Sequence, residues 1–233
     1  MNLKNIEPFT YDREFLYNKW QELIYNISYD WQTTTFSDKW FHLLDEYYTK
    51  STNYFSTWSR VQNSIKALTE FCNETRKISI NNEDLLALAS FFAYVDFDVT
   101  NCDNFVDSAI LVDKFCEDVG IGNQDNKVMY SLLSSLDYHN VFDEENNIMY
   151  HAFRDINFIW TGLEYDQYSR LIGFMKNEFP MSEDLWCRFR KLIAEEMLGG
   201  HPVMHTDYFF YLCAEQVQNN LLDEIQIYSE IKV

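Results

Sequence analysis

"NNEDLLALASFFAYVDFD", residues 81–98, is the stretch of the sequence that decides the fold. It begins with Asn and Asp candidates for a helix cap, and the rest is apolar on all sides until the acids Asp96 and Asp98. A helix without a polar face must be covered on every side by other elements. We therefore predict that residues 81–96 form the central helix of a helical bundle.

Periodic apolar residues before and after this segment predict the helices that cover it. The chain has only six Gly and three Pro, so few residues would interrupt such helices. Helical spacing is found in residues 11–27, 37–49, 54–75, 104–120, 126–139, 149–162, 166–179, 182–198 and 207–231. The sequence thus predicts an all-α protein with a single domain, residues 12–230, after an N-terminal tail, residues 1–11.

Several residues are suited to the ends of these helices. We expect Asp12 and Ser182 to cap the first turns of two of them, because short polar side chains accept hydrogen bonds from free backbone N–H groups. Gly120 and Gly199 are expected to end two others, since glycine adopts the left-handed conformation of a C-terminal cap. Around residues 156–160 the pattern fits a short helix or a strand equally well, and we interpret it as a short helix that ends at Gly162.

The balance of charge excludes some classes of partner. The chain has 37 acidic residues against 18 basic ones and a net charge of -19, which would repel a phosphate backbone. No cluster of basic residues stands out that could bind anionic lipid. We therefore expect neither a nucleic-acid nor a membrane partner.

The cysteines and the N-terminus indicate the cellular compartment. Five cysteines at wide spacings, without a CxxC pair, are typical of reduced thiols in a protein core. The N-terminus has no continuous apolar signal segment, and no apolar run approaches the length that spans a bilayer. We predict an intracellular, cytoplasmic protein.

A resemblance to a known family is carried by five segments, "YYTKSTNYFSTWSRVQNSI", "LALASFFAYVDFDVTNCDNFVDSA", "FRDINFIWTG", "YDQYSRLIGFMKNEFPMSEDLWCRFRKLIAEEML" and "HTDYFFYLCAEQVQNNLLDEI". In this order they resemble the predicted metal-dependent HD-domain phosphohydrolases of the small, all-helical bacterial type. The resemblance covers roughly residues 12–228 and implies an HD-domain-like helical bundle. In that family, His and Asp side chains would hold one or two divalent cations that activate a water molecule for attack on phosphorus.

The family's first two motifs have lost their metal ligands in this chain. They run approximately as R-x-Y-H-x-x-x-H and F-H-D-x-V-Y-D. Phe55 and Ser59 stand where the two His of the first motif would be, and Ala93 and Tyr94 replace the His-Asp pair of the second. Aromatic carbon would fill the cavity that the cations occupy in the family.

A few candidate site residues remain. In the family's fourth motif, D-x-D-L-x-I-L-G, Asp155 is kept, but Asn157 stands at the second Asp. His139 falls near a family His, and Asp98 matches a framework acid of the second motif. Asp155, His139 and Asp98 are therefore the residual catalytic candidates, and the former metal-site positions are Phe55, Ser59, Ala93, Tyr94, Asp155 and Asn157.

We expect from this pattern a catalytically inactive HD-like protein, a pseudoenzyme that holds no cofactor and no metal and acts by binding a protein partner. Two alternatives stay open. One is a metal-dependent phosphohydrolase that acts on a nucleotide or another phosphate ester, with a rearranged site that includes Asp96. The other is a binder that keeps a nucleotide or a different small molecule in the old pocket, stacked on Tyr94 or Phe55, without hydrolysing it.

Overall fold

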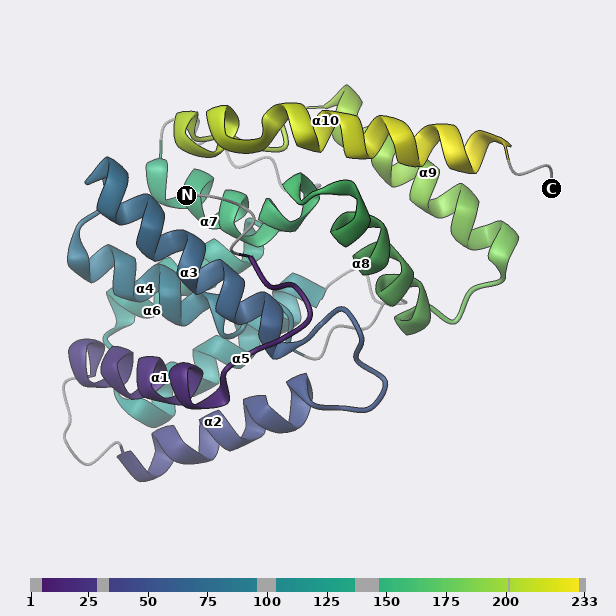
Figure 1. Ribbon diagram of the computed structural model, residues 1–233. Coiled ribbons are helices and arrows are strands. Elements are labelled where there is room, and N and C mark those ends of the chain that lie inside the picture. Colours follow the sequence, from purple (N-terminus) through teal and green to yellow (C-terminus); the bar gives the residue numbers. More distant parts are fainter. Residues whose placement is uncertain (1–5, 29–33, 96–103, 137–146, 201, 231–233) are drawn as a thin grey trace.

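The regular elements of the described chain are all helices. The computed structural model describes residues 6–28, 34–95, 104–136, 147–200 and 202–230, and within them it has ten α-helices, one 3₁₀ helix and no strand (Figure 1). They are α1 (Arg13–Ile27), α2 (Thr34–Tyr48), α3 (Trp58–Thr75), α4 (Ile80–Ser90), α5 (Asn104–Val119), α6 (Asn123–Ser134), α7 (Ile148–Phe158), η3 (Ile159–Gly162), α8 (Tyr165–Glu178), α9 (Glu183–Gly199) and α10 (Asp207–Glu230). The predicted all-α class is confirmed.

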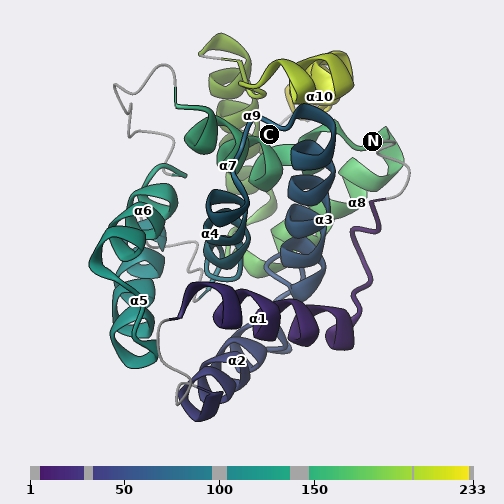
Figure 2. The ribbon, with the colours of Figure 1, turned by 90° about the vertical axis from the view of Figure 1, so that its left-hand side faces the viewer.

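Helix α4 is the central helix, as its apolar surface predicts. It packs against α1, α3, α6 and α7, and every residue from 84 to 90 is buried. Figure 2 shows α4 between α6 on one side and α3 on the other, with α1 below it. A helix that touches four others needs apolar side chains all round, and this explains why residues 85–95 lack a polar stripe.

The end of α4 differs from the prediction. The sequence pattern continues the helix to Asp96, but α4 ends at Ser90 and residues 91–95 form turns. The hydroxyl of Tyr48 donates a hydrogen bond to the Phe91 carbonyl oxygen, at 2.9 Å. Because a partner from α2 satisfies this carbonyl, the backbone can leave the helix while Phe91 stays fully buried.

Most of the expected caps are confirmed. The Asp12 carboxylate accepts the Phe15 N–H at 3.0 Å, and Ser182 accepts the Leu185 N–H at 3.4 Å. Gly120 follows α5 with a φ of 70°, in the left-handed region. There are two exceptions. Ser79 caps α4 instead of an Asn or Asp, and α9 ends at Gly199 without a left-handed glycine, since its C-cap Gly200 has a φ of -94°.

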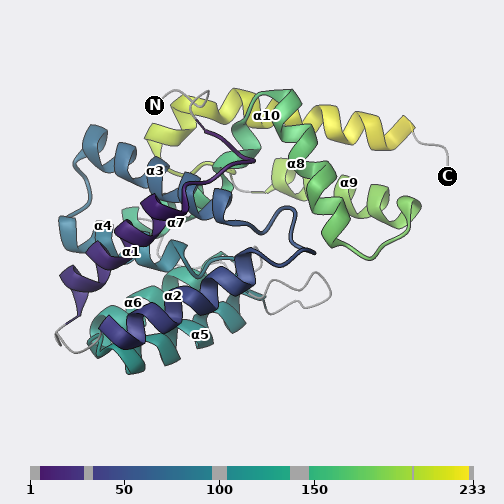
Figure 3. The ribbon, with the colours of Figure 1, turned by 60° about the horizontal axis from the view of Figure 1, so that its bottom comes forward.

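The remaining helices gather at two sides of α4 and form one body with it. α1, α2, α5 and α6 lie on one side, while α8, α9 and α10 lie on the other; Figures 1 and 3 both show α9 and the C-terminal part of α10 extending away from α4. α7 and η3 connect the two sides, because α7 packs on α3 and α4 while η3 packs on α10.

The N-terminal segment before α1 lies against α3. The Pro8 carbonyl accepts a hydrogen bond from Ser59 Oγ at 2.8 Å, and the Glu7 carbonyl accepts one from Asn63 Nδ2 at 3.1 Å. Ile6 is buried in the core. Residues 6–11 are therefore part of the packed body.

The four described cysteines, Cys72, Cys116, Cys187 and Cys213, are buried free thiols. This agrees with their predicted place in the core, whereas Cys102 lies outside the described residues. Burial raises the pKa of Cys213 to about 12, so the thiol stays protonated.

In the part of the chain that the structure describes, none of the helices combines the length and the apolar composition that a membrane span requires.

Candidate functional site

A buried arginine marks the place where the sequence predicts a lost metal site. Arg60 lies in the first turn of α3, and only 7% of its surface is exposed. Its guanidinium carbon lies 4.0 Å from the centre of the Phe55 ring and 3.7 Å from that of Tyr94. The Trp160 ring, from η3, is 5.6 Å away. We name this arrangement of one arginine and three rings the Arg60 cage.

Three of the six former metal-site positions meet in this cage: Phe55, Tyr94 and Asn157. The Asn157 carbonyl oxygen accepts hydrogen bonds from Arg60 Nη2 at 3.0 Å and from the Tyr94 hydroxyl at 3.1 Å. Three positions that the sequence analysis assigns to lost metal ligands thus contact a cationic side chain of the chain itself.

A carboxylate from α8 fixes the loop that carries Phe55. Glu178 accepts hydrogen bonds from the backbone N–H groups of Phe55 and Ser56, and from Ser56 Oγ at 3.1 Å. The Phe55 ring then meets the edge of Trp160 at a centroid distance of 5.2 Å. Trp160 in turn stacks on Tyr168 of α8, with the ring centres 5.9 Å apart. Contacts with α8 thus hold both Phe55 and Trp160 in place.

The electrostatics of the cage are those of a cation held by aromatic faces. Among the described residues, no carboxylate forms an ion pair with Arg60. Burial lowers the pKa of Arg60, and the nearby Tyr94 and Glu178 oppose this shift. A cation over an aromatic ring gains about 2 kcal/mol or more when it is shielded from water, which offsets part of the cost of burial.

Asp155, the candidate surviving ligand, has a different role in the structure. Its carboxylate is fully buried and accepts hydrogen bonds from the His205 and Thr206 N–H groups, both at 2.8 Å, and from Thr206 Oγ1 at 2.7 Å. These donors precede α10, so Asp155 anchors the start of that helix. Asp155 and Asn157 are two residues apart on α7, about 200° around its axis, and therefore face different neighbours.

Two histidines lie beside this anchor. The rings of His151 and His205 have their centroids 5.4 Å apart, and His205 Nδ1 is 3.6 Å from Asp155 Oδ1. Burial lowers the pKa of His151, and His205 lowers it further. Across the described residues, however, no three His, Cys, Asp or Glu side chains are grouped so that they could hold a metal ion.

The other predicted site residues are not part of the cage. Ser59 donates a hydrogen bond to the N-terminal segment, as described above, and Ala93 is buried in the core. Asp98 and His139 lie outside the described residues, as does Asp96. The structure therefore brings together Phe55, Tyr94 and Asn157, but it places Ser59, Ala93 and Asp155 elsewhere.

The space beside the cage is small. A cavity of about 20 Å³ is lined by residues of α3, α7 and η3, including Arg60, Asn157 and Trp160. Pockets for small-molecule ligands typically measure about 300 to 1,000 Å³. A nucleotide would therefore need the aromatic side chains of the cage to move aside.

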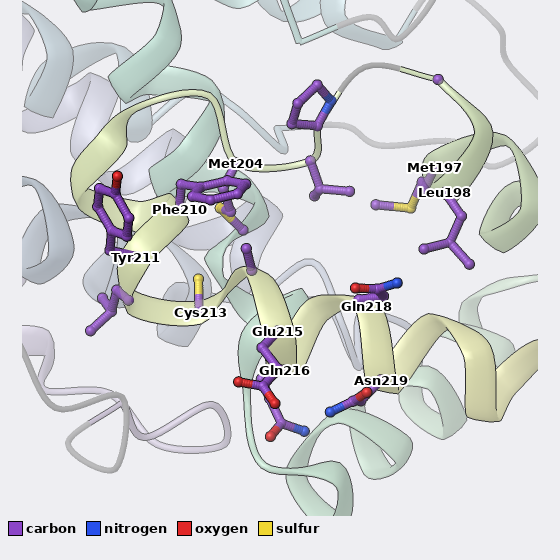
Figure 4. A pocket seen from close by; sticks show the side chains of 15 residues that line it. Met197, Leu198, Met204, Phe210, Tyr211, Cys213, Glu215, Gln216, Gln218 and Asn219 are labelled. Carbon is purple, nitrogen blue, oxygen red and sulfur yellow. The ribbon is translucent and has the colours of Figure 1, made fainter.

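A much larger groove lies between the end of α9 and the start of α10 (Figure 4). Its volume is about 910 Å³, and its lining is apolar on one side, with Met197, Leu198 and Phe210. Gln218 and Asn219 add amide groups from α10, and of the lining residues that the structure describes only Glu215 is charged. Phe210 is 48% exposed and Tyr211, also at the groove, is 86% exposed. Exposed aromatic side chains beside apolar and amide groups are typical of surfaces that bind proteins.

Sequence reasoning missed Arg60, Trp160 and the groove. One signal for Arg60 was present, because Ser64, Ala67 and Phe71 follow it at helical spacing and all are buried. An arginine on such a buried face must meet partners inside the protein.

Comparisons with known proteins found no matching family model, no similar curated protein and no similar solved structure.

Proposed function

We propose that this chain is a catalytically inactive, HD-domain-like protein that acts by binding a protein partner. The observation that carries the proposal is the Arg60 cage. Phe55, Tyr94 and Asn157, at three former metal-site positions, surround a guanidinium group. A fixed positive charge repels a divalent cation, and aromatic rings offer it no oxygen or nitrogen ligand.

The hydrogen bonds of Asp155 support the same proposal. A carboxylate that ligates a cation needs an oxygen directed toward the ion, whereas both oxygens of Asp155 accept hydrogen bonds from residues 205 and 206. Releasing them would leave buried N–H groups unpaired at the start of α10, which costs roughly 1 to 3 kcal/mol for each group. The fold thus uses this acid for its own stability.

The α9–α10 groove is the surface that we propose for the partner. Its apolar lining fits apolar side chains, and its amide groups can bind a peptide backbone. Among the described residues that line it, none is basic and Glu215 is acidic, and the whole chain has a net charge of -19. The partner segment is therefore expected to be apolar on one face and to carry basic residues beside it.

An activity screen tests the catalytic part of the proposal. The protein is incubated with phosphate monoesters and nucleotides in the presence of Mn²⁺, Mg²⁺ or Ni²⁺. We expect no turnover above that of a buffer control. Turnover that disappears in an Asp155→Asn variant with unchanged circular dichroism would contradict the proposal and would support the metal-dependent phosphohydrolase.

Two matched tyrosine variants test the binding part. Tyr211 at the groove and Tyr25 on α1 are 86% and 87% exposed, so serine at either position should leave the fold intact. We expect the protein captured by the wild-type chain to be retained by Tyr25→Ser and lost from Tyr211→Ser, first in affinity purification and then with the purified partner. Equal binding by both variants would rule out the groove as the site.

A further inference from the structure

Four residues that line the cavity beside the Arg60 cage each have an unpaired polar atom. Within the described ranges, hydrogen-bond partners are missing for Arg60 Nη1, Asn63 Oδ1, Asn157 Oδ1 and Trp160 Nε1. These four side chains are at least nine-tenths buried, and all four residues line the same cavity of about 20 Å³. Buried polar groups in proteins nearly always have a partner, so a cluster of four unpaired atoms around one cavity points to a ligand.

The hydrogen bonds around the cavity fix which atoms donate and which accept. Asn63 Nδ2 donates to the Glu7 carbonyl at 3.1 Å, and Asn157 Nδ2 donates to the Phe153 carbonyl at 2.8 Å. Both amide groups therefore leave an acceptor oxygen without a partner. Arg60 Nη1 and the Trp160 indole nitrogen can only donate. The cavity thus offers two donors and two acceptors.

We infer that this cavity holds a single internal water molecule. A water accepts two hydrogen bonds and donates two, which matches the four groups. It needs roughly 10 to 15 Å³ of space for a water-sized sphere, which the cavity provides with little to spare. An anion would be repelled by the two amide oxygens, and a cation would be repelled by the guanidinium.

This water completes the environment of Arg60. Nη2 of the guanidinium donates to the Asn157 carbonyl, and Nη1 donates to the water. Because Arg60 and Asn63 belong to α3, Asn157 to α7 and Trp160 to η3, the water connects three helices at the centre of the body. The inference is independent of the proposed function, since it rests only on the hydrogen-bonding groups of the cage.

The indole N–H signals of the tryptophans provide the test. Trp20 Nε1 donates to Ser37 and Trp58 Nε1 donates to Asp45, so these two buried indoles have protein acceptors and act as internal controls. In a water-selective nuclear Overhauser experiment we expect a cross-peak from Trp160, with the sign of a long-lived water, and none from Trp20 or Trp58. The Trp160 signal is identified by its absence from Trp160→Phe. No cross-peak at Trp160 would overturn the inference.

A cavity-filling variant and a crystal soak sharpen the result. Asn63→Leu removes one acceptor and fills the space with carbon, so the Trp160 cross-peak should disappear while the Trp20 and Trp58 signals stay in place. A cross-peak that persists in this variant would contradict the inference. Anomalous scattering from bromide in the cavity of a soaked crystal would also overturn it, in favour of an anion site. Should Asn63→Leu fail to fold, the wild-type spectrum decides the matter.

Discussion

Arg60 and Arg190 are both buried, but the protein holds their charges in opposite ways. Arg190, on α9, forms a bidentate pair with Glu224 of α10, at 2.8 and 2.9 Å, and the Tyr168 hydroxyl donates to the same carboxylate. Arg60 has no such partner among the described residues and lies between the rings of Phe55 and Tyr94. Burial opposes both charges. The Glu224 carboxylate outweighs it and raises the pKa of Arg190, whereas the pKa of Arg60 is lowered.

The difference shows which arginine the fold needs. Helices α9 and α10 share the ion pair of Arg190 and Glu224. Removal of either side chain would leave the other charge buried and unpaired. The Arg60 cage contains one charge only, and its rings and carbonyl remain satisfied without it. We infer that the ion pair serves the stability of the C-terminal helices, whereas the cage depends less on the charge of Arg60.

Substitution of Arg190 by methionine should break the comparison most strongly. Arg190→Met leaves the Glu224 carboxylate buried with only the Tyr168 hydroxyl as a partner. We expect a loss of about 3 to 5 kcal/mol in the free energy of unfolding, measured by urea denaturation. The double variant Arg190→Met/Glu224→Leu should recover part of this loss. A loss of less than about 1 kcal/mol in the single variant would show that the pair is not essential.

Gly162 lies where the two regions meet. It is the last residue of η3, which carries Trp160 of the cage, and η3 packs on α10, which carries Glu224. A Cβ atom at this position would lie 2.7 Å from Cys213 Cβ. We expect Gly162→Ala to destabilise the protein by about 1 to 3 kcal/mol, since two backbones must separate. Gly173→Ala on α8 is the control, because a Cβ there meets nothing within 4 Å. The control should be neutral or up to about 1 kcal/mol more stable, and equal effects at both glycines would contradict the close packing of η3 on α10.

The same methionine substitution at Arg60 should have a much smaller effect. Arg60→Met keeps apolar contact with the rings, and the Asn157 carbonyl still accepts the Tyr94 hydroxyl. The lost cation–π attraction is offset by the removal of a buried charge, so we expect a change within about 1.5 kcal/mol in either direction. If Arg60→Met were as destabilising as Arg190→Met, the cage would be as essential to the fold as the ion pair.

The smallest effect is expected from a change of pH, through the side chain of His151 on α7. Because the folded protein favours its neutral form, the pKa of His151 is lowered from the ordinary value of 6.5. The unfolded chain therefore takes up a proton first, so the contribution of His151 to stability is full above about pH 6.5 and declines as the pH falls below it. Urea denaturation between about pH 7.5 and 5.5 should show a smaller decline for His151→Gln than for the wild type. Parallel curves for the two proteins would contradict this role.

The sequence predicted the helices because each one has to bury an apolar face. The continuous apolar surface of residues 85–95 indicated a central helix, since the pattern of apolar residues shows how many sides of a helix are covered by neighbours. The end of α4 could not be predicted in this way. It depends on the Tyr48 hydroxyl, which lies on another helix 43 residues away from its acceptor, Phe91.

The candidate site could be predicted only in part. Motif positions grouped Phe55, Tyr94 and Asn157 with three other residues, and in the structure these three contact the Arg60 guanidinium. The role of Asp155 could not be read from the sequence, because its donors are at residues 205 and 206 and reach it only when α10 packs on η3. The Arg60 cage was missed for the same reason, since its rings come from three separate segments.

Elemental analysis of the purified protein tests the central claim most directly, namely that Arg60 and its rings have replaced a bound cation. The protein is dialysed first against Mn²⁺, Mg²⁺ or Ni²⁺ and then against metal-free buffer. With Arg60 in the cage and Asp155 engaged at α10, no metal should remain above the buffer background. A stoichiometric amount of metal retained by the folded wild-type chain would contradict the account.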